Sequence, residues 1–235
     1  MSRVLSMTSF RVAARRLFNF RSSKIDGFRV VCDASRMDFE ICRALLRGSY
    51  ELAERTLARA AIRTGDNVLE IGAGIGIVSL VCAKLAAPGQ VTSYEANSTL
   101  APLMRENFSL NGLTPHLISK AVTELGGKIH FFKNENFIAS SIIEMNRISD
   151  KVTVESDSID AAISISKANI IVMDVEGAEI GLLKKANLSS IREIIVEVHP
   201  HIVGDEPIHD MVLHLEQQGF VEKKRQRKTI WFSKT

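Results

Sequence analysis

The segment from Val68 to Leu85 constrains the fold of this 235-residue chain more than any other. A short apolar run, Val68-Leu-Glu-Ile, leads into Gly72, Gly74 and Gly76, and an apolar stretch of helical spacing follows. A short apolar run bounded by turn residues predicts a buried strand, and glycines permit a tight turn that a ligand can approach closely. The segment therefore predicts a strand, a ligand-binding turn and a helix in succession.

Apolar strands and helices alternate along the rest of the chain. Further helices are expected at 38–46, 51–62, 99–110, 179–185 and 208–217, and further strands at 28–32, 91–95, 116–122, 128–133, 151–155, 170–174 and 193–199. This alternation predicts right-handed βαβ units and an α/β, Rossmann-like fold with a mainly parallel sheet. Strands at 220–222 and 229–232, joined by a basic turn over 223–228, predict a C-terminal antiparallel hairpin at the sheet edge.

The net charge of +3 is distributed unevenly. Residues 1–24 contain six basic residues and no acidic one, which leaves a charge of −3 for the rest of the chain. We therefore expect a basic N-terminal tail or helix at 1–24 and one domain at 25–235. Residues 10–18 could form a basic amphipathic helix on an anionic membrane, and a solvated helix or frayed end is the alternative.

Composition also bears on location. The three cysteines are widely spaced and match neither a disulfide framework nor a zinc motif, which suits a reducing compartment. No apolar run is long enough to span a membrane. We expect a cytoplasmic protein, with a mitochondrial or membrane-peripheral location as the alternative because the tail is rich in arginine and lacks acidic residues. The sequence gives no indication of the oligomeric state.

Two classes of cofactor use a glycine-rich turn between a strand and a helix. A dinucleotide fingerprint has the spacing G-x-G-x-x-G, but here Gly76 comes one position early. Glu70 precedes the turn and suits a cationic ligand, while Glu95 ends the next strand and can accept hydrogen bonds from a ribose. The pattern favours S-adenosylmethionine over a nicotinamide dinucleotide or a turn without a ligand.

Three carboxylates, Asp174, Glu176 and Glu179, follow the buried strand at 170–174. Burying a charge is costly unless it is paired, so these residues point to a functional site. The alternative for Glu176 and Glu179 is a simple preference for the positive N-terminus of a helix. The position of Asp174 at a strand end is where this architecture places ligand contacts.

His199 is the candidate general base. It shares one face of the strand at 193–199 with Glu197, because side chains alternate along a strand, and histidine titrates near neutral pH. A surface histidine at a strand end is the alternative. The set of His199, His201, Asp205 and His209 matches no known metal motif, so no metal site is expected.

Over about residues 28–197, these features resemble the FkbM family of S-adenosylmethionine-dependent methyltransferases. The resemblance rests on Gly48-Ser-Tyr-Glu51, Glu70 to Gly76, Tyr94-Glu-Ala-Asn97, Asn107-x-x-x-Asn111-Gly112, Asp157-Ser-Ile-Asp160 and Met173-Asp-Val-Glu-Gly-Ala-Glu179. The chain departs from the family where Glu70, Ile75, Ala96 and Val172 replace the more usual aspartate, asparagine, proline and lysine.

The resemblance implies a class I methyltransferase fold with seven strands and helices on both faces of the sheet, and S-adenosylmethionine as the cofactor. The residues implied to bind the cofactor are Glu51, Glu70, Gly72, Ala73, Gly74, Gly76, Glu95, Ala96, Asn97, Ala121 and Asp174. The candidates for a catalytic role are Asp174, Glu176 and His199.

These expectations lead to a function. We expect methylation of a hydroxyl on a small molecule, sugar or lipid-linked acceptor, with peripheral membrane contact through the basic tail. The alternatives are a protein or RNA methyltransferase, a cofactor-binding relative without catalysis, or a nicotinamide oxidoreductase. No nucleic-acid partner is expected, because the body is acidic and its basic residues cluster only at 223–228.

Overall fold

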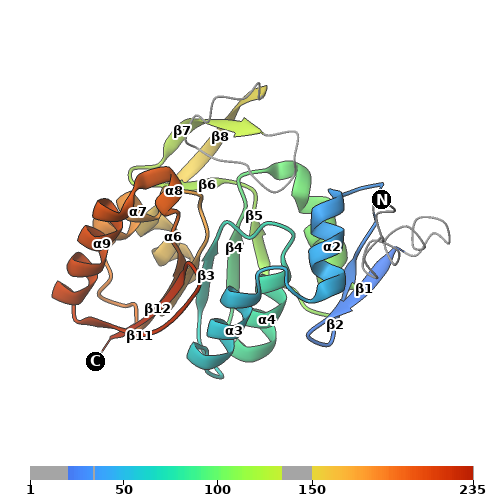
Figure 1. The fold of residues 1–235 in the computed structure, drawn as a ribbon, viewed down its shortest axis with the longest axis horizontal. Helices are drawn as coiled ribbons and strands as arrows, with labels where there is room; N and C mark the ends of the chain where they lie inside the picture. Colours follow the sequence, from blue (N-terminus) through green and yellow to red (C-terminus); the bar gives the residue numbers. More distant parts are fainter. Residues whose placement is uncertain (1–20, 34, 134–149, 235) are drawn as a thin grey trace, which may run out of the picture.

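The computed structural model describes residues 21–33, 35–133 and 150–234 (Figure 1). Within this part of the chain, a seven-stranded sheet has the order β11-β12-β10-β9-β3-β4-β5. Its strands are β3 (Val68–Ile71), β4 (Val91–Tyr94), β5 (His116–Ile118), β9 (Ile170–Met173), β10 (Glu193–Glu197), β11 (Phe220–Gln226) and β12 (Thr229–Lys234). The strands from β10 to β5 are parallel, whereas β12 is antiparallel to both β10 and β11. The predicted mainly parallel, Rossmann-like sheet and its C-terminal hairpin are confirmed.

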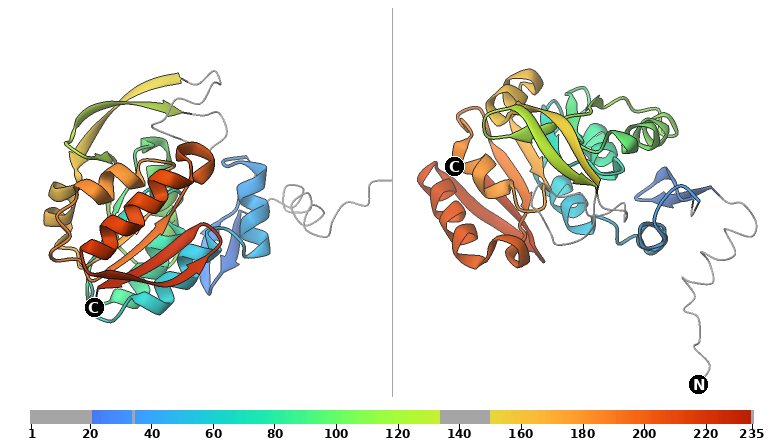
Figure 2. Two further views of the ribbon diagram at one scale, coloured as in Figure 1. Left: turned by 60° about the vertical axis from the view of Figure 1, so that its left-hand side comes forward. Right: turned by 90° about the horizontal axis from the view of Figure 1, so that it is seen from above.

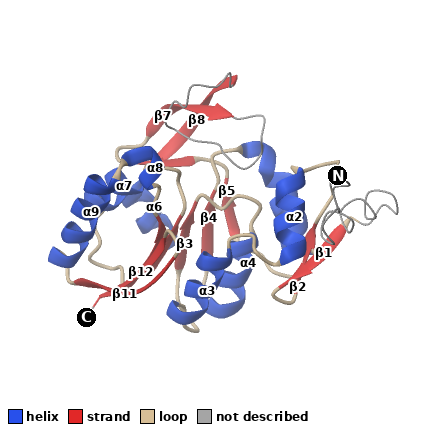
Figure 3. Ribbon diagram, viewed as in Figure 1, coloured by secondary structure: helices blue, strands red, loops and turns tan. Residues whose placement is uncertain are grey.

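Helices cover both faces of this sheet (Figure 3). One face packs against α3 (Leu52–Ala61), α4 (Ile77–Ala86) and α5 (Ala101–Ser109), and the other against α6 (Ile159–Ser166), α7 (Glu179–Lys185) and α9 (Asp205–Gln217). Val68 and Ile170 join the first core and their neighbours Leu69 and Ile171 join the second, as the alternation of side chains requires. The central strands β3 and β9 are therefore buried on both faces and apolar except at Glu70.

An N-terminal hairpin precedes the sheet. It consists of β1 (Ser22–Ile25) and β2 (Phe28–Val31), and α2 (Phe39–Arg47) follows it. β1 begins three residues before the domain boundary expected at residue 25, because Ser22, Ser23 and Lys24 pair with β2. The amphipathic helix expected at 10–18 lies outside the described residues.

A second, three-stranded sheet has the order β6-β8-β7. Its strands are β6 (Ala121–Thr123), β7 (Gly127–Lys133) and β8 (Asp150–Ser158), and it lies above the carboxyl ends of the central strands in Figure 1 and in front of them in the view from above in Figure 2. The prediction of one strand at 116–122 is wrong. β5 ends at Ile118, and β6 belongs to the three-stranded sheet. The polar insertion after Lys133 lies outside the described residues.

The basic turn predicted at 223–228 is also wrong in extent. β11 continues through Lys223, Lys224 and Arg225 to Gln226, with an irregularity between Glu222 and Lys224, so only residues 227–228 form the turn. Cross-strand pairing extends the strand despite its charged composition, because these side chains are exposed at the sheet edge. No helix in the described part of the chain is long and apolar enough to cross a membrane.

Candidate active site

The glycine turn lies between β3 and α4 and is tied to the end of β4. The N–H groups of Gly72 and Ala73 donate to the carbonyl of Tyr94 at 3.0 and 3.1 Å. The N–H of Gly74 donates to Oε2 of Glu95 at 2.8 Å, and Oε1 of Glu95 accepts the N–H of Asn97 at 2.7 Å. The turn and the acidic residue predicted to serve one ligand are therefore one hydrogen-bonded unit.

Close packing explains two of the glycines. A Cβ atom at Gly72, where φ is +84°, would lie 1.7 Å from the backbone oxygen of Asp174, so the turn and the end of β9 can meet only at a glycine. A Cβ at Gly74, where φ is +54°, would lie 3.2 Å from the hydroxyl of Tyr50 and 3.3 Å from Oε1 of Glu51. The turn thus places Asp174 and Glu51 beside the same space.

Unpaired carboxylate oxygens face this region. Oε2 of Glu51 and Oδ1 of Asp174 are each removed from solvent and have no hydrogen-bond partner among the described residues. Burial raises the pKa of Glu51 well above its usual value, and the charges of Glu54 and Asp174 raise it further. Burial, followed by the charge of Glu197, likewise raises the pKa of Asp174. A cationic ligand would relieve both effects, since an opposite charge nearby favours the ionised form.

Glu70 lies behind the turn and is only 2% exposed. Its Oε2 accepts hydrogen bonds of 2.5 Å from the hydroxyls of Ser79 and Ser93. Burial raises its pKa to about 7 although these hydrogen bonds oppose the shift. The carboxylate of Glu70 borders a small cavity and not the larger one that Glu51 and Asp174 line, so a direct contact with the cofactor stays a prediction.

His199 follows β10 and sits among carboxylates. Its Nε2 lies 3.5 Å from Oδ1 of Asp174, 3.4 Å from Oε2 of Glu176 and 4.0 Å from Oε1 of Glu197. Burial lowers the pKa of His199, but the hydrogen bond with Glu179 and the charges of Asp174 and Glu176 outweigh this and raise it to about 9. The ring is 4% exposed, so this is a largely buried, charge-paired site.

Glu179 supports the histidine from behind. Its Oε1 accepts the backbone N–H of His199 at 3.0 Å and lies 3.4 Å from the ring Nδ1. Its Oε2 accepts the N–H of Gly177 at 2.7 Å. Burial raises the pKa of Glu179, but these interactions hold it below its usual value. Glu179 is therefore a structural carboxylate that fixes the orientation of the ring.

A cavity of about 290 Å³ joins these groups at the carboxyl ends of β3, β4, β9 and β10. Nine predicted site residues line it: Glu51, Gly72, Gly74, Glu95, Ala96, Ala121, Asp174, Glu176 and His199. Ala73, Gly76 and Asn97 do not line it; Gly76 caps the N-terminus of α4, and the side chain of Asn97 accepts a hydrogen bond from the N–H of Thr99. The roles assigned to all of these residues stay predictions.

Several further side chains line the cavity and were not among the predicted site residues, including the polar side chains of Tyr50, Lys120 and Glu197. Glu197 had a signal in the sequence, because alternation put it on the face of His199. Tyr50 had one too, since it belongs to the Gly-Ser-Tyr-Glu segment. Lys120, whose Nζ lies 2.8 Å from Oδ1 of Asp157, had none, because it stands between two strands that the sequence did not separate.

Comparison with protein families identifies a known domain in this chain. A model described as the methyltransferase FkbM domain matches residues 70–222. The matched segment runs from Glu70 in β3 to Glu222 in β11, so it includes the glycine turn and the cluster around His199.

Among curated proteins, the ribosomal RNA small subunit methyltransferase A of Magnetococcus marinus is 46% identical over 54 residues. This match covers 23% of the chain and only 19% of that relative. Among solved structures, M. jannaschii TYW2 in complex with AdoMet is 17% identical, with 91% of this chain and 86% of that chain covered and a TM-score of 0.49. The M. jannaschii tRNA m1G37 methyltransferase is 14% identical, with 91% and 56% covered and a TM-score of 0.48.

Proposed function

Because this chain belongs to the FkbM family of S-adenosylmethionine-dependent methyltransferases, we propose that it methylates a hydroxyl oxygen on a small-molecule, sugar or lipid-linked acceptor. The observation that carries this proposal is one cavity lined by two kinds of group. Carboxylates suited to bind a cation lie near the glycine turn, and groups suited to accept a proton surround His199.

The chain's own residues fit a cofactor with a positively charged amino acid end. Glu51 presents a buried oxygen without a hydrogen-bond donor, and an ammonium group supplies such donors; Asp174 borders the same space and adds negative charge. Glu95 lies at the end of β4 and is positioned by two backbone N–H groups, where its remaining lone pairs can accept from a ribose. We assign these three carboxylates to cofactor binding.

When bound, S-adenosylmethionine supplies an electrophilic methyl group, which an acceptor oxygen takes as the methyl–sulfur bond breaks. A carboxylate held against the sulfonium would stabilise the ground state more than the transition state, so it would not raise the rate. The chain contributes mainly by positioning the acceptor, an effect that can reach about 7–11 kcal/mol.

The acceptor hydroxyl must also lose its proton. The three candidates for this role border the cavity: Asp174, Glu176 and His199. The carboxylates of Asp174 and Glu176 each lie within 3.5 Å of the Nε2 atom of His199. General-base assistance of this kind contributes about 10²–10⁴-fold. With a pKa of about 9, His199 holds its own proton near neutral pH, so a neighbouring carboxylate is the group that accepts the hydroxyl proton there. The gathering of these groups at one end of the cavity supports an oxygen acceptor.

A second candidate function is methylation of RNA. The curated relative over 54 residues is a ribosomal RNA methyltransferase. The exposed basic side chains of β11, Lys223, Lys224 and Arg225, offer phosphate contacts on this chain. The acidic cavity argues against RNA, since polyanion binding needs positive charge around the site.

A labelled-methyl assay separates these functions. The full chain is incubated with S-adenosylmethionine carrying a labelled methyl group and a cell extract divided into small molecules, lipids, RNA and protein. We expect label in the small-molecule or lipid fraction, as a methyl ether that resists mild base. Label only in RNA or protein would contradict the proposal. D174N is the inactive comparison, and D210N, which changes an exposed aspartate on α9, is its matched control.

A further inference from the structure

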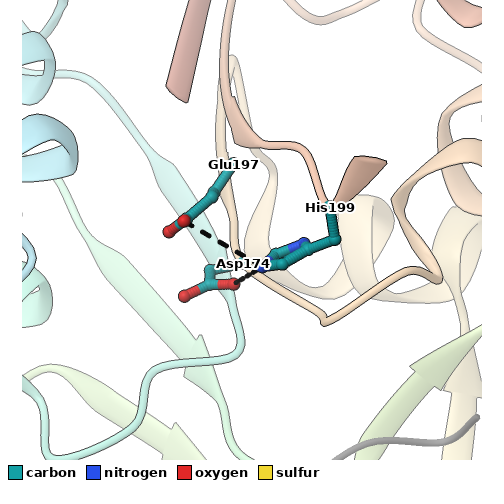
Figure 4. A group of neighbouring side chains, drawn as sticks. All are labelled: Asp174, Glu197 and His199. Carbon is teal, nitrogen blue, oxygen red and sulfur yellow. Dashed lines mark ion pairs between the residues drawn. The ribbon is translucent and has the colours of Figure 1, made fainter. Parts of the chain in front are cut away.

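Three side chains at the acidic end of the cavity have the geometry of metal ligands (Figure 4). Asp174 follows β9, Glu197 ends β10, and His199 lies two residues further on. The two strands are parallel neighbours, with Val196 paired to Met173, so their carboxyl ends meet. One ligand atom from each of the three side chains lies within 4.8 Å of the others. Two carboxylates and an imidazole therefore face one small volume.

One carboxylate oxygen in that volume accepts no hydrogen bond, although it lies at ion-pair distance from His199. Oδ1 of Asp174 has no hydrogen-bond partner in the described part of the chain and is removed from solvent. A buried polar atom left without a partner costs free energy, so such atoms call for an explanation. This oxygen lies 3.5 Å from Nε2 of His199, on the side where the three ligand atoms converge.

The surroundings of His199 give an independent indication. Metal-binding histidines characteristically direct their second ring nitrogen to a carboxylate, which fixes the tautomer and the ring orientation. Here Nδ1 of His199 lies 3.4 Å from Glu179, a fully buried carboxylate that the backbone of Gly177 holds in place. This arrangement leaves Nε2 directed toward Asp174 and Glu197 (Figure 4).

We infer that Asp174, Glu197 and His199 bind one divalent transition-metal ion of the Mn²⁺ or Fe²⁺ class. Mixed oxygen and imidazole ligands suit such ions, and three protein ligands leave open positions, as in catalytic sites. The inference deepens the proposed function and rests on it, because an open position facing the cavity would bind the acceptor hydroxyl. The ion would lower the pKa of that hydroxyl, and the proton would pass to the neighbouring carboxylate of Glu176.

From the residues alone we expect no metal site, because the histidines and aspartate at 199–209 match no metal motif. The proposed ligands are instead drawn from the ends of two strands that are about 20 residues apart in the chain. Their proximity depends on the parallel pairing of β9 and β10, which spacing alone does not reveal.

The test measures binding of Mn²⁺ alone to chelator-treated full-length protein, by the loss of the electron paramagnetic resonance signal of the free ion. We expect one ion per chain. D174N, E197Q and H199Q should each weaken binding about tenfold or more, since even loss of a supporting carboxylate costs about 10–100-fold. The matched controls E206Q and H209Q change exposed residues of α9 and should bind Mn²⁺ as the wild type does.

Folding is checked by thermal unfolding of each variant, and the affinity for S-adenosylhomocysteine is measured without metal. No binding to the wild type at millimolar Mn²⁺, or equal binding by the three ligand variants and the controls, would overturn the metal site. If chelated protein still methylates a hydroxyl, the metal inference fails and the proposed function stands. If Mn²⁺ binds as expected but the label enters only RNA or protein, the proposed acceptor fails and the metal site stands.

Discussion

The two halves of the cavity are held together in different ways. In the glycine half, which comprises the turn from Gly72 to Gly76 and Glu95, the backbone N–H groups of Gly74 and Asn97 fix the acidic side chain. In the acidic half, which comprises Asp174, Glu176, Glu197 and His199, the contacts are between charged side chains at 3.4–4.0 Å. The glycine half is preformed by the main chain, whereas the acidic half depends on charge balance.

The sharpest test of this contrast is D174N, because Asp174 lies where the two halves meet. The substitution keeps the shape of the side chain and removes its charge. We expect kcat to fall by about 10³-fold, within the range for loss of proton-transfer assistance, and the affinity for S-adenosylhomocysteine to fall by less than tenfold. Steady-state kinetics and calorimetric titration provide the two values.

The matched control is D210N, whose aspartate is more than half exposed and lies 3.7 Å from Lys184. It should leave both values unchanged. Equal losses of kcat and cofactor affinity in D174N would place Asp174 in the glycine half alone, and an unchanged kcat would remove it from the chemistry.

The second prediction concerns Glu70, which lies behind the glycine turn, and the pH dependence of the free energy of unfolding. Burial raises the pKa of Glu70 to about 7, against 4.5 in an unfolded chain. Between these values the unfolded chain releases a proton that the folded chain keeps, so the free energy of unfolding falls as pH rises. The loss is roughly 3 kcal/mol for this shift. Glu95 has the same shift for the same cause and acts in the same direction.

Denaturant unfolding of the ligand-free protein at pH 5 and pH 8 tests this prediction. The wild type should be more stable at pH 5, and the difference should be smaller in E70Q, which cannot ionise at this position; Glu95, Glu197 and His199, whose pKa values are also raised, keep the rest of it. E106Q changes an exposed glutamate and should behave as the wild type does. Greater stability at pH 8 than at pH 5 would show that Glu70 is stabilised as a carboxylate, contrary to the effect of its burial.

Sequence reasoning was more successful for the glycine half than for the acidic half. The turn and the helix that follows are local in sequence, so periodicity and glycine spacing were sufficient to place them, whereas Glu95, 21 residues beyond Gly74, was recognised by its position at a strand end. Asp174 and His199 were also identified, but their proximity depends on the register between β9 and β10. Pairing between distant strands is not encoded in any single segment, so the approach of Glu197 to Asp174 could not be read from the sequence, although alternation placed Glu197 on the face of His199.

The part of the cavity lined by Lys120 and Ala121 was also hard to predict from the sequence. Lys120 and Ala121 stand where the chain leaves the main sheet and enters the small sheet of β6, β7 and β8. The run from 116 to 122 was predicted as one strand, but the polar pair Ser119-Lys120 interrupts it where the chain passes from one sheet to the other. At β11 the error was the reverse: a turn was predicted where the strand continues. The reason is that an exposed edge strand tolerates a run of charged residues that is also typical of a turn.

The third prediction concerns Asn107, which joins the glycine half to the N-terminal hairpin. Its Oδ1 accepts the N–H of Val31 at 2.7 Å, and its Nδ2 donates to the carbonyl of Ile75 at 2.9 Å. Because the side chain is fully buried, N107A would leave both backbone groups without partners. We expect a loss of roughly 2–3 kcal/mol in the free energy of unfolding, measured by urea denaturation.

Asn111 offers a matched comparison. It bridges the N–H and carbonyl of Arg29 at 2.8 and 2.7 Å, but at the surface, where water can replace it. N111A should therefore cost about 1 kcal/mol or less. A loss in N107A no larger than in N111A would mean that the hairpin does not support the turn.

The smallest effect is expected for E95A, which tests whether the glycine half binds the ribose. Removing the carboxylate eliminates an acceptor at the end of β4, so the affinity for S-adenosylhomocysteine should fall about tenfold, or roughly 1.4 kcal/mol. Glu95 also accepts the N–H groups of Gly74 and Asn97, so part of this loss would come from a loosened turn. Titration with adenine-containing ligands that lack the ribose hydroxyls separates the two contributions. The penalty should largely vanish for such ligands if the carboxylate contacts the ribose, and it should persist if Glu95 only holds the turn.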